Sequence, residues 1–156
     1  MSVARSFHVP NRLGAVMRRA GGIRANEAIA RAEAGVEQFR EESLKTIGEI
    51  MAQLDERFGP TAERDGADFE ELYTLVLRMI DVSGFVTHTG LDRSAVSLCT
   101  LVDTMAERGR WRWPAVDVHL DAMRLLWTQG ETLAEGEREA VIDGLYKVSK
   151  HKPASE

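Results

Sequence analysis

The sequence predicts an all-α protein, an antiparallel four-helix bundle with an additional helix and a flexible basic N-terminal arm. Apolar residues recur at steps of three and four through five segments, which is the period of a helix with one buried face. No segment alternates apolar and polar residues between hairpin turns, as strands would. The length of 156 residues suits one domain with its own core. We expect an arm over residues 1–24, the bundle over 25–150 and a tail over 151–156.

The first predicted helix begins at Asn26, whose side chain can cap it, and stops at Gly59 and Pro60. Its apolar face consists of Ile29, Ala32, Val36, Phe39, Ser43, Ile47, Ile50, Leu54 and Phe58. At 1.5 Å per residue this helix would be roughly 50 Å long. We therefore expect it either to bend near Gly35 or Gly48 or to pair with another copy.

The second predicted helix starts at Asp68 or a neighbour and runs to about Val86. It carries two adjacent apolar stripes, Phe69, Leu72, Val76, Met79 and Ser83 on one and Tyr73, Leu77, Ile80 and Gly84 on the other. Such a helix should contact neighbours on two sides. After a turn over residues 87–90, a third helix runs to just before Gly109. So short a turn requires the two helices to be antiparallel.

Two further helices complete the predicted bundle. Pro114 fits the first turn of the fourth helix, and Gly130 follows its end. A fifth helix begins at about Leu133. Trp111 and Trp113 precede the fourth helix, where they either clamp the end of the bundle or form an aromatic patch for a partner.

Charge and composition restrict the classes of partner. The net charge is −5, but residues 1–24 hold five arginines and no acid, which leaves −10 for the remainder. An acidic body argues against nucleic acid as the main partner. The arm is a solvated tail, a tether to an acidic surface, or an arm for nucleic acid or membrane. One cysteine, no signal peptide and no long apolar run predict a cytoplasmic protein without membrane insertion.

The segment 75–103, LVLRMIDVSGFVTHTGLDRSAVSLCTLVD, resembles the helical hairpin of histidine-phosphotransfer domains. In that family the motif is similar to His-x-x-Lys-Gly, followed by a short turn that ends in Gly and a helix whose apolar residues lead to an acid. The residues in this register are Ile80, Asp81, Val82, Ser83 and Gly84, then Gly90, Leu98, Leu101 and Asp103. The resemblance implies a helical bundle that docks on signalling partners.

Two departures from this motif remove its chemistry. Ile80 stands where the family has its phospho-accepting histidine, and Ser83 stands where it has lysine. What remains is a ridge, which we predict binds a response-regulator receiver domain or a histidine kinase without catalysis or cofactor. Its predicted contact residues are Tyr73, Leu77, Ile80, Asp81 and Gly84. Burial of this ridge by the first or fifth helix, or against a twin in a structural homodimer, is the alternative.

Residues 26–34 (NEAIARAEA), 97–103 (SLCTLVD) and 118–126 (VHLDAMRLL) also resemble the small alphaproteobacterial chemotaxis proteins called CheE. This resemblance implies a non-enzymatic protein that works with chemotaxis phosphorelay components. It implies no particular binding residues.

His119 is the one histidine that the pattern places on a helix of the bundle. The rival functional hypothesis is therefore an active phosphotransfer protein that uses His119 as its phospho-acceptor. The structural alternative is that His119 only makes hydrogen bonds within the bundle. Asp117 and Asp121 flank it, but positions two apart on a helix face different directions, so we do not expect them to orient the ring. Four scattered histidines predict no metal site, and Cys99 is predicted to be a small core residue.

Overall fold

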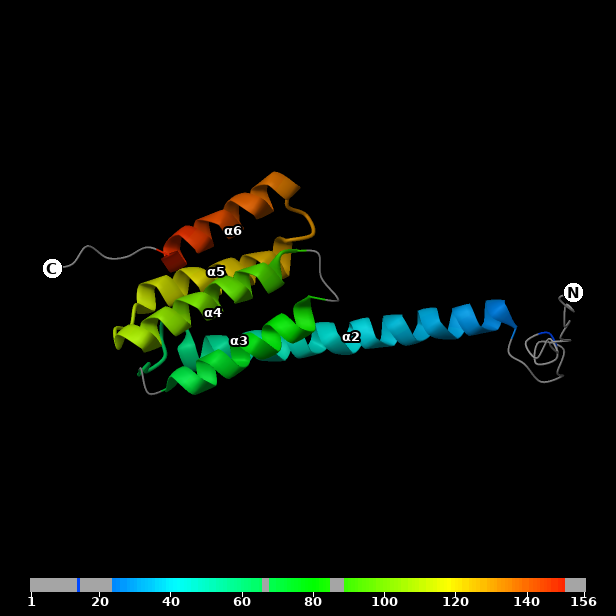
Figure 1. Ribbon diagram of the computed structural model, residues 1–156, viewed down its shortest axis with the longest axis horizontal. Helices are drawn as coiled ribbons and strands as arrows, with labels where there is room; N and C mark the ends of the chain where they lie inside the picture. The colour runs from blue at the N-terminus through cyan, green and yellow to red at the C-terminus, as the bar shows by residue number, and fades with distance from the viewer. Residues whose placement is uncertain (1–13, 15–23, 66–67, 85–88, 151–156) are drawn as a thin grey trace, which may run out of the picture. The chain divides into compact units, whose positions relative to one another are not determined.

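A computed structural model of the protein describes Gly14 and residues 24–65, 68–84 and 89–150 (Figure 1). From residue 24 onwards, the helices are α2 (Ala25–Phe58), α3 (Phe69–Ser83), α4 (Leu91–Arg108), α5 (Trp113–Gln129) and α6 (Glu135–Lys150). The described residues contain no strand, which confirms the all-α prediction for this part of the chain. Most of the predicted arm, the tail and the residues around His88 lie outside the described residues.

The chain forms two compact units, residues 1–38 and 39–156, with the division inside α2. In the first unit, every helical residue from 25 to 38 is exposed. In the second unit, α2 buries Ile47, Ile50, Leu54 and Phe58. The predicted apolar face of the first helix is therefore buried in its second half only. Periodicity marks a face of a helix, but its burial depends on which elements lie beside it.

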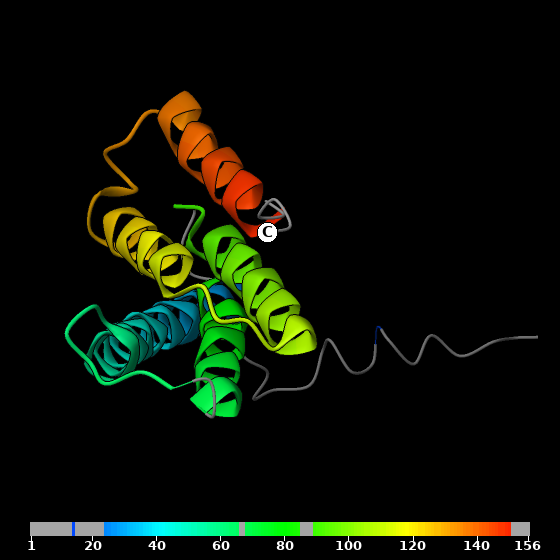
Figure 2. The same cartoon turned by 90° about the vertical axis from the view of Figure 1, so that its left-hand side faces the viewer.

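In the second unit, α4 contacts α3, α5 and α6 (Figure 2). Successive helices from α2 to α5 run in opposite directions, and α6 lies against α4 and α5. Two ion pairs join α2 to its neighbours, Asp55 with Arg124 of α5 and Arg57 with Glu71 of α3. Exposed pairs of this kind contribute little to stability, so the order of the helices rests on apolar packing.

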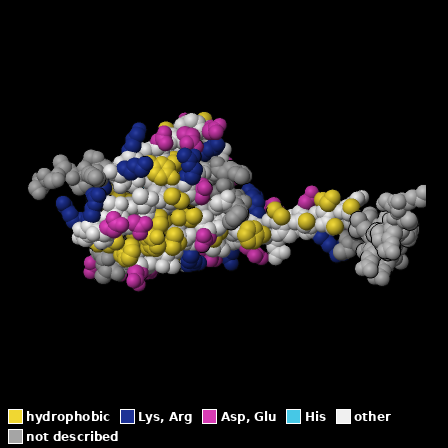
Figure 3. All heavy atoms as spheres, in the orientation of Figure 1, with side chains coloured by type: hydrophobic (Ala, Val, Ile, Leu, Met, Phe, Trp, Pro, Cys, Tyr) yellow, Lys and Arg dark blue, Asp and Glu magenta, His cyan; other side chains and the backbone are white. Residues whose placement is uncertain are grey.

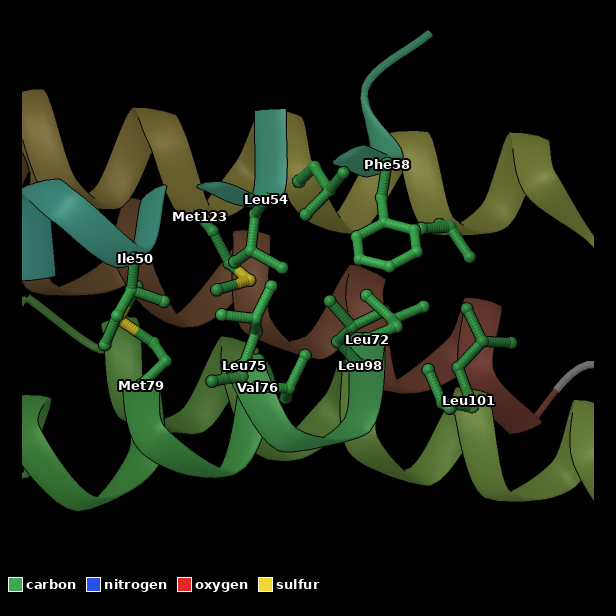
Figure 4. Packing of buried hydrophobic residues seen from close by; sticks show 14 of the residues in the cluster. Ile50, Leu54, Phe58, Leu72, Leu75, Val76, Met79, Leu98, Leu101 and Met123 are labelled. Carbon is green, nitrogen blue, oxygen red and sulfur yellow. The ribbon is translucent and has the colours of Figure 1, made fainter. Parts of the chain in front are cut away.

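The core of this unit is built from the predicted inner faces. Leu54 and Phe58 of α2 point towards Leu72 and Leu75 of α3, and Leu98 of α4 lies in the same layer (Figure 4). Leu98 has no exposed surface. The remaining buried apolar residues include Val76, Met79, Leu91, Ala95, Leu101, Val102, Met105, Val116, Leu120, Met123, Ile142 and Leu145.

Glycines shape both ends of α4. Gly90 precedes the helix with φ +81°, and a Cβ there would lie 2.5 Å from Cδ1 of Ile142 in α6. Both facts favour glycine, because another residue would be strained at this φ and its Cβ would displace the Ile142 side chain. Gly109 ends the helix with φ +60°, and its N–H donates to the carbonyl of Ala106. These positions agree with the boundaries that the sequence predicts.

An aromatic cluster lies at one end of the helices of the second unit. Trp111 and Trp113 stack with ring centroids 5.3 Å apart, and the ring of Phe69 at the start of α3 lies 6.3 Å from Trp111. The guanidinium of Arg64, in the loop after α2, lies 5.0 Å from the Trp113 ring and pairs with Asp117 of α5. The tryptophans therefore join three segments of the unit, as an end clamp does.

We expect Leu98→Ala to lower the free energy of unfolding by about 2–5 kcal/mol, because it removes a fully buried side chain and leaves a cavity. Val96→Ala on the same helix is the control, and its half-exposed side chain should cost less than about 1 kcal/mol. Urea unfolding followed by circular dichroism measures both. Equal losses for the two variants would contradict this account of the core.

Candidate functional site

The predicted ridge lies on α3, beside the face that enters the core. Leu77 is 40% exposed, Asp81 and Gly84 are exposed, and Tyr73 and Ile80 are half-buried against the core. The other stripe of α3 faces the core, and its residues Leu72, Val76, Met79 and Ser83 are buried. The ridge is therefore a surface feature of the second unit with its inner edge resting on the core.

Tyr73 of α3 lies beside Cys99 of α4, close enough for each side chain to affect the pKa of the other. Because the two helices are antiparallel, one turn forward on α3 corresponds to one turn back on α4. Leu77 therefore lies at the level of Val96, which is also 40% exposed. We call Tyr73, Leu77, Ile80, Val96 and Cys99 the docking strip. Figure 3 shows hydrophobic side chains gathered over α3 and α4 on this face.

The docking strip carries no charge of its own at neutral pH. The hydrogen bond to Cys99 raises the pKa of Tyr73, and nearby Asp103 raises it further. Burial raises the pKa of the Cys99 thiol, partly offset by the hydrogen bond from Tyr73. A protonated thiol is a poor nucleophile, so the geometry favours contact rather than thiol chemistry here. The exposed carboxylate of Asp81 borders the strip.

Gly84 lies at one end of the docking strip, directly after α3. Its backbone is helical, with φ −62°, and its N–H donates to the carbonyl of Ile80 over 3.3 Å. A Cβ at this position would meet only that same carbonyl oxygen, at 3.5 Å. Among the described residues, no neighbouring helix therefore needs a glycine here.

A polar pocket of about 260 Å³ lies next to Gly84, between the start of α4 and the start of α6. Its main charges are engaged within the protein: Arg93 pairs with Glu139, and Arg138 donates to the carbonyls of Gly130 and Leu133. The Arg93 guanidinium lowers the pKa of the Glu139 carboxyl. These contacts hold α6 against α4 and the end of α5.

His119 lies inside the second unit and has no exposed surface. Its Nδ1 lies 2.7 Å from the carbonyl oxygen of Ala115, so Nδ1 carries the proton and donates it there. Its Nε2 lies 3.0 Å from Oγ of Ser97 on α4, which is 3.5 Å from Oγ of Ser149 on α6. Burial lowers the pKa of His119, and Arg112 lowers it further, although the Ala115 hydrogen bond acts in the opposite direction.

This placement bears on the rival hypothesis of an active phosphotransfer protein. A phospho-accepting imidazole must reach a partner's phosphoryl group, and both nitrogens of His119 are occupied by partners inside the protein. Asp117 pairs with Arg64, and Asp121 pairs with Arg124 over 2.6 Å, so both carboxylates have partners other than the ring. The geometry does not favour His119 as an acceptor.

Two further classes of site can be checked among the described residues. No group of three or more His, Cys, Asp and Glu side chains in this part of the chain could hold a metal ion. Within the same residues, no helix has both the length and the apolarity needed to cross a membrane. His8, His88, His151 and the first four arginines of the predicted arm lie outside the described part.

Sequence reasoning placed the ridge on α3 but missed Val96 of α4. The signal that could have found it was the second apolar stripe of α3, which required a neighbour, together with the short turn that makes α4 that neighbour.

No protein family, no curated protein and no solved structure matches the chain. The case for a function therefore rests on the geometry described above and on the resemblances of the sequence.

We expect the buried histidine to make the protein less stable in mild acid. Because burial lowers its pKa in the folded state, the unfolded chain binds the proton more readily, near its ordinary value of about 6.5. Stability should be full above that pH and fall below it, by up to about 1.4 kcal/mol per pH unit. Urea unfolding at two pH values, one above and one below the unfolded pKa, measures the loss.

The matched variant is His119→Gln, whose amide can keep both hydrogen bonds but cannot titrate. Its stability should change less between the two pH values than that of the natural chain. An identical pH dependence in both proteins would show that His119 is not the group responsible.

Proposed function

We propose that the chain is a non-enzymatic protein of chemotaxis or two-component signalling, a pseudo-phosphotransfer module that binds a receiver domain or a histidine kinase. In this proposal α2 to α5 act as a phosphotransfer-like antiparallel four-helix bundle, and α6 is the additional helix. The contact surface is the docking strip with Asp81 and Gly84 at its end. The same proposal places the protein inside the cell, together with the phosphorelay components.

The observation that carries the proposal is the open apolar strip across α3 and α4. Leu77 and Val96 are each 40% exposed on neighbouring helices, and an apolar surface of this kind gains free energy when a partner covers it. Gly84 favours close approach, because, in the part of the chain that the structure describes, only the Ile80 carbonyl oxygen lies within 4 Å of the place that a methyl group would take there. A rigid helical face that needs no rearrangement suits recognition of a folded domain.

The chemistry of the strip supports binding and not transfer. The residue at the family's histidine position is Ile80, a half-buried hydrocarbon side chain that cannot accept a phosphoryl group. Ser83 follows in the lysine position, is buried, and donates its hydroxyl to the carbonyl of Met79 over 2.6 Å. The cation that would steady a phosphoryl group in the family is therefore replaced by a neutral side chain that faces its own helix.

We expect Gly84→Arg and Leu77→Glu each to weaken binding to the cognate receiver domain or kinase at least tenfold. The arginine blocks close approach, and the glutamate places a charge that must lose its hydration in the contact. The measurement is titration calorimetry of the full chain against a set of purified receiver domains and histidine kinases from one chemotaxis system.

Two variants provide matched controls. Gly136→Arg makes the same change at an open glycine of α6, and Val118→Glu makes it at a side chain of α5 that is 47% exposed. Both should bind like the natural chain, and all four variants should keep its circular dichroism. Failure of the natural chain to bind any member of the set, or full binding by Gly84→Arg and Leu77→Glu, would overturn the proposal.

A further inference from the structure

The first half of α2 carries an apolar stripe that the protein leaves open. Ile29 is 58% exposed and Val36 is 67% exposed, both in the first unit, and Phe39, the first residue of the next unit, is 57% exposed. With Ala32, these residues follow one another along the helix at steps of three, four and three. This is the spacing of the a and d positions of a coiled coil, with Ile29 and Val36 at a and Ala32 and Phe39 at d.

This stretch has a helix-forming composition, because ten of its fourteen residues from 25 to 38 are Ala, Glu, Arg or Gln, but its apolar face lacks packing. Helices in proteins draw most of their stability from packing of an apolar face, yet every residue from 25 to 38 is exposed. Gly35 lies in its middle, and glycine costs about 1 kcal/mol relative to alanine in a helix. A second element that covered the stripe would supply the missing packing.

We propose that a second copy of this chain covers the stripe, so that residues 26–40 of two protomers form a short parallel coiled coil in register. In parallel coiled coils, β-branched residues at a with Leu at d favour two strands; both a positions here, Ile29 and Val36, are β-branched, while the d positions hold Ala and Phe. The small side chain of Ala32, between Ile29 and Val36 along the stripe, lets the two helices approach each other closely. This surface is separate from the docking strip, and the proposal does not depend on the proposed function.

The charges beside the stripe agree with a parallel pair. One flank holds Ala28 and Gly35, and the other holds Asn26, Glu33 and Arg40. In a parallel pair each flank meets the opposite flank of the partner, so Glu33 faces Ala28 of the second copy and Arg40 faces its Gly35. No like charges meet across the seam.

An antiparallel pair that overlays the same stripe is less favourable. Ile29 would then face Phe39 of the other copy, and the two-fold axis would pass near residue 34. This arrangement brings Glu33 beside Glu33 of the second copy, and like charges at that distance repel. The charged residues Glu27, Arg31 and Glu37 lie away from the seam in either arrangement, so the flanks decide the orientation.

We expect reversible association of the full chain at micromolar concentrations, since four seam positions per helix make a contact below the roughly 1,200–2,000 Å² of a standard interface. Sedimentation equilibrium should show the mean mass rising from monomer towards dimer with concentration. Val36→Glu should keep the chain monomeric, because it puts two carboxylates into the seam. Ala34→Glu, which adds the same charge on the outer face, should associate like the natural chain.

The sedimentation experiment distinguishes dimer formation from a chain that stays monomeric. A natural chain that stays monomeric throughout, or a Val36→Glu variant that associates like it, would overturn the proposal. Leu77→Glu, which tests the docking strip, should still dimerise, so loss of dimerisation and loss of partner binding are distinguishable.

Disulfide trapping tests the orientation. In a Cys99→Ser background, Ala32→Cys should oxidise to a covalent dimer much faster than Ala34→Cys, because a disulfide needs Cα atoms within about 7 Å. Parallel pairing in register places the two copies of position 32 against each other, whereas the antiparallel pair places position 32 against position 36. Equal rates of trapping at positions 32 and 34 would refute the parallel pair.

Discussion

The antiparallel packing of α3 against α4 is the constraint on which the docking strip depends. Each helix buries one apolar face, and their contact brings a second stripe of α3 to the surface beside Val96 and Cys99. Tyr73 of α3 lies beside Cys99 of α4 in this arrangement. Gly90 allows α6 to lie close to the start of α4, so the helix that organises the strip is itself held from the other side.

Polar groups inside this unit connect its helices. His119 links α5 to Ser97 of α4, and Ser97 lies next to Ser149 of α6. Buried polar groups that find partners specify one arrangement of helices, because each alternative arrangement would leave them unpaired. The same partners remove the imidazole from solvent. A residue that looked like a rival phospho-acceptor in the sequence is thus best explained as a connection between three helices.

The two exposed apolar surfaces differ in what they can recognise. The docking strip lies across two packed helices, so its shape is set before a partner arrives. The stripe on α2 lies along a single helix whose residues 25–38 are all exposed, and a matching helix is the simplest shape that covers it. If both proposals hold, a dimer would present two docking strips, and a partner that itself is dimeric would bind with added avidity.

The sequence by itself determined the helices and most of their ends, because these depend on local signals. Steps of three and four mark apolar faces, Pro114 fits a first turn, and Gly109 ends α4 in the left-handed conformation that glycine adopts easily. Asp68 stands before α3 as expected, although its side chain makes no capping hydrogen bond.

Only the tertiary structure decided which faces are covered. The same spacing continues from Ile29 to Phe58, yet the first part of that face is exposed and the last part is buried. Likewise, helical spacing placed His119 beside the inner face, whereas Ser97 and Ser149 of other helices make it a fully buried residue. Burial is a relation between segments far apart in the chain, and a periodic pattern within one segment holds no information about its neighbours.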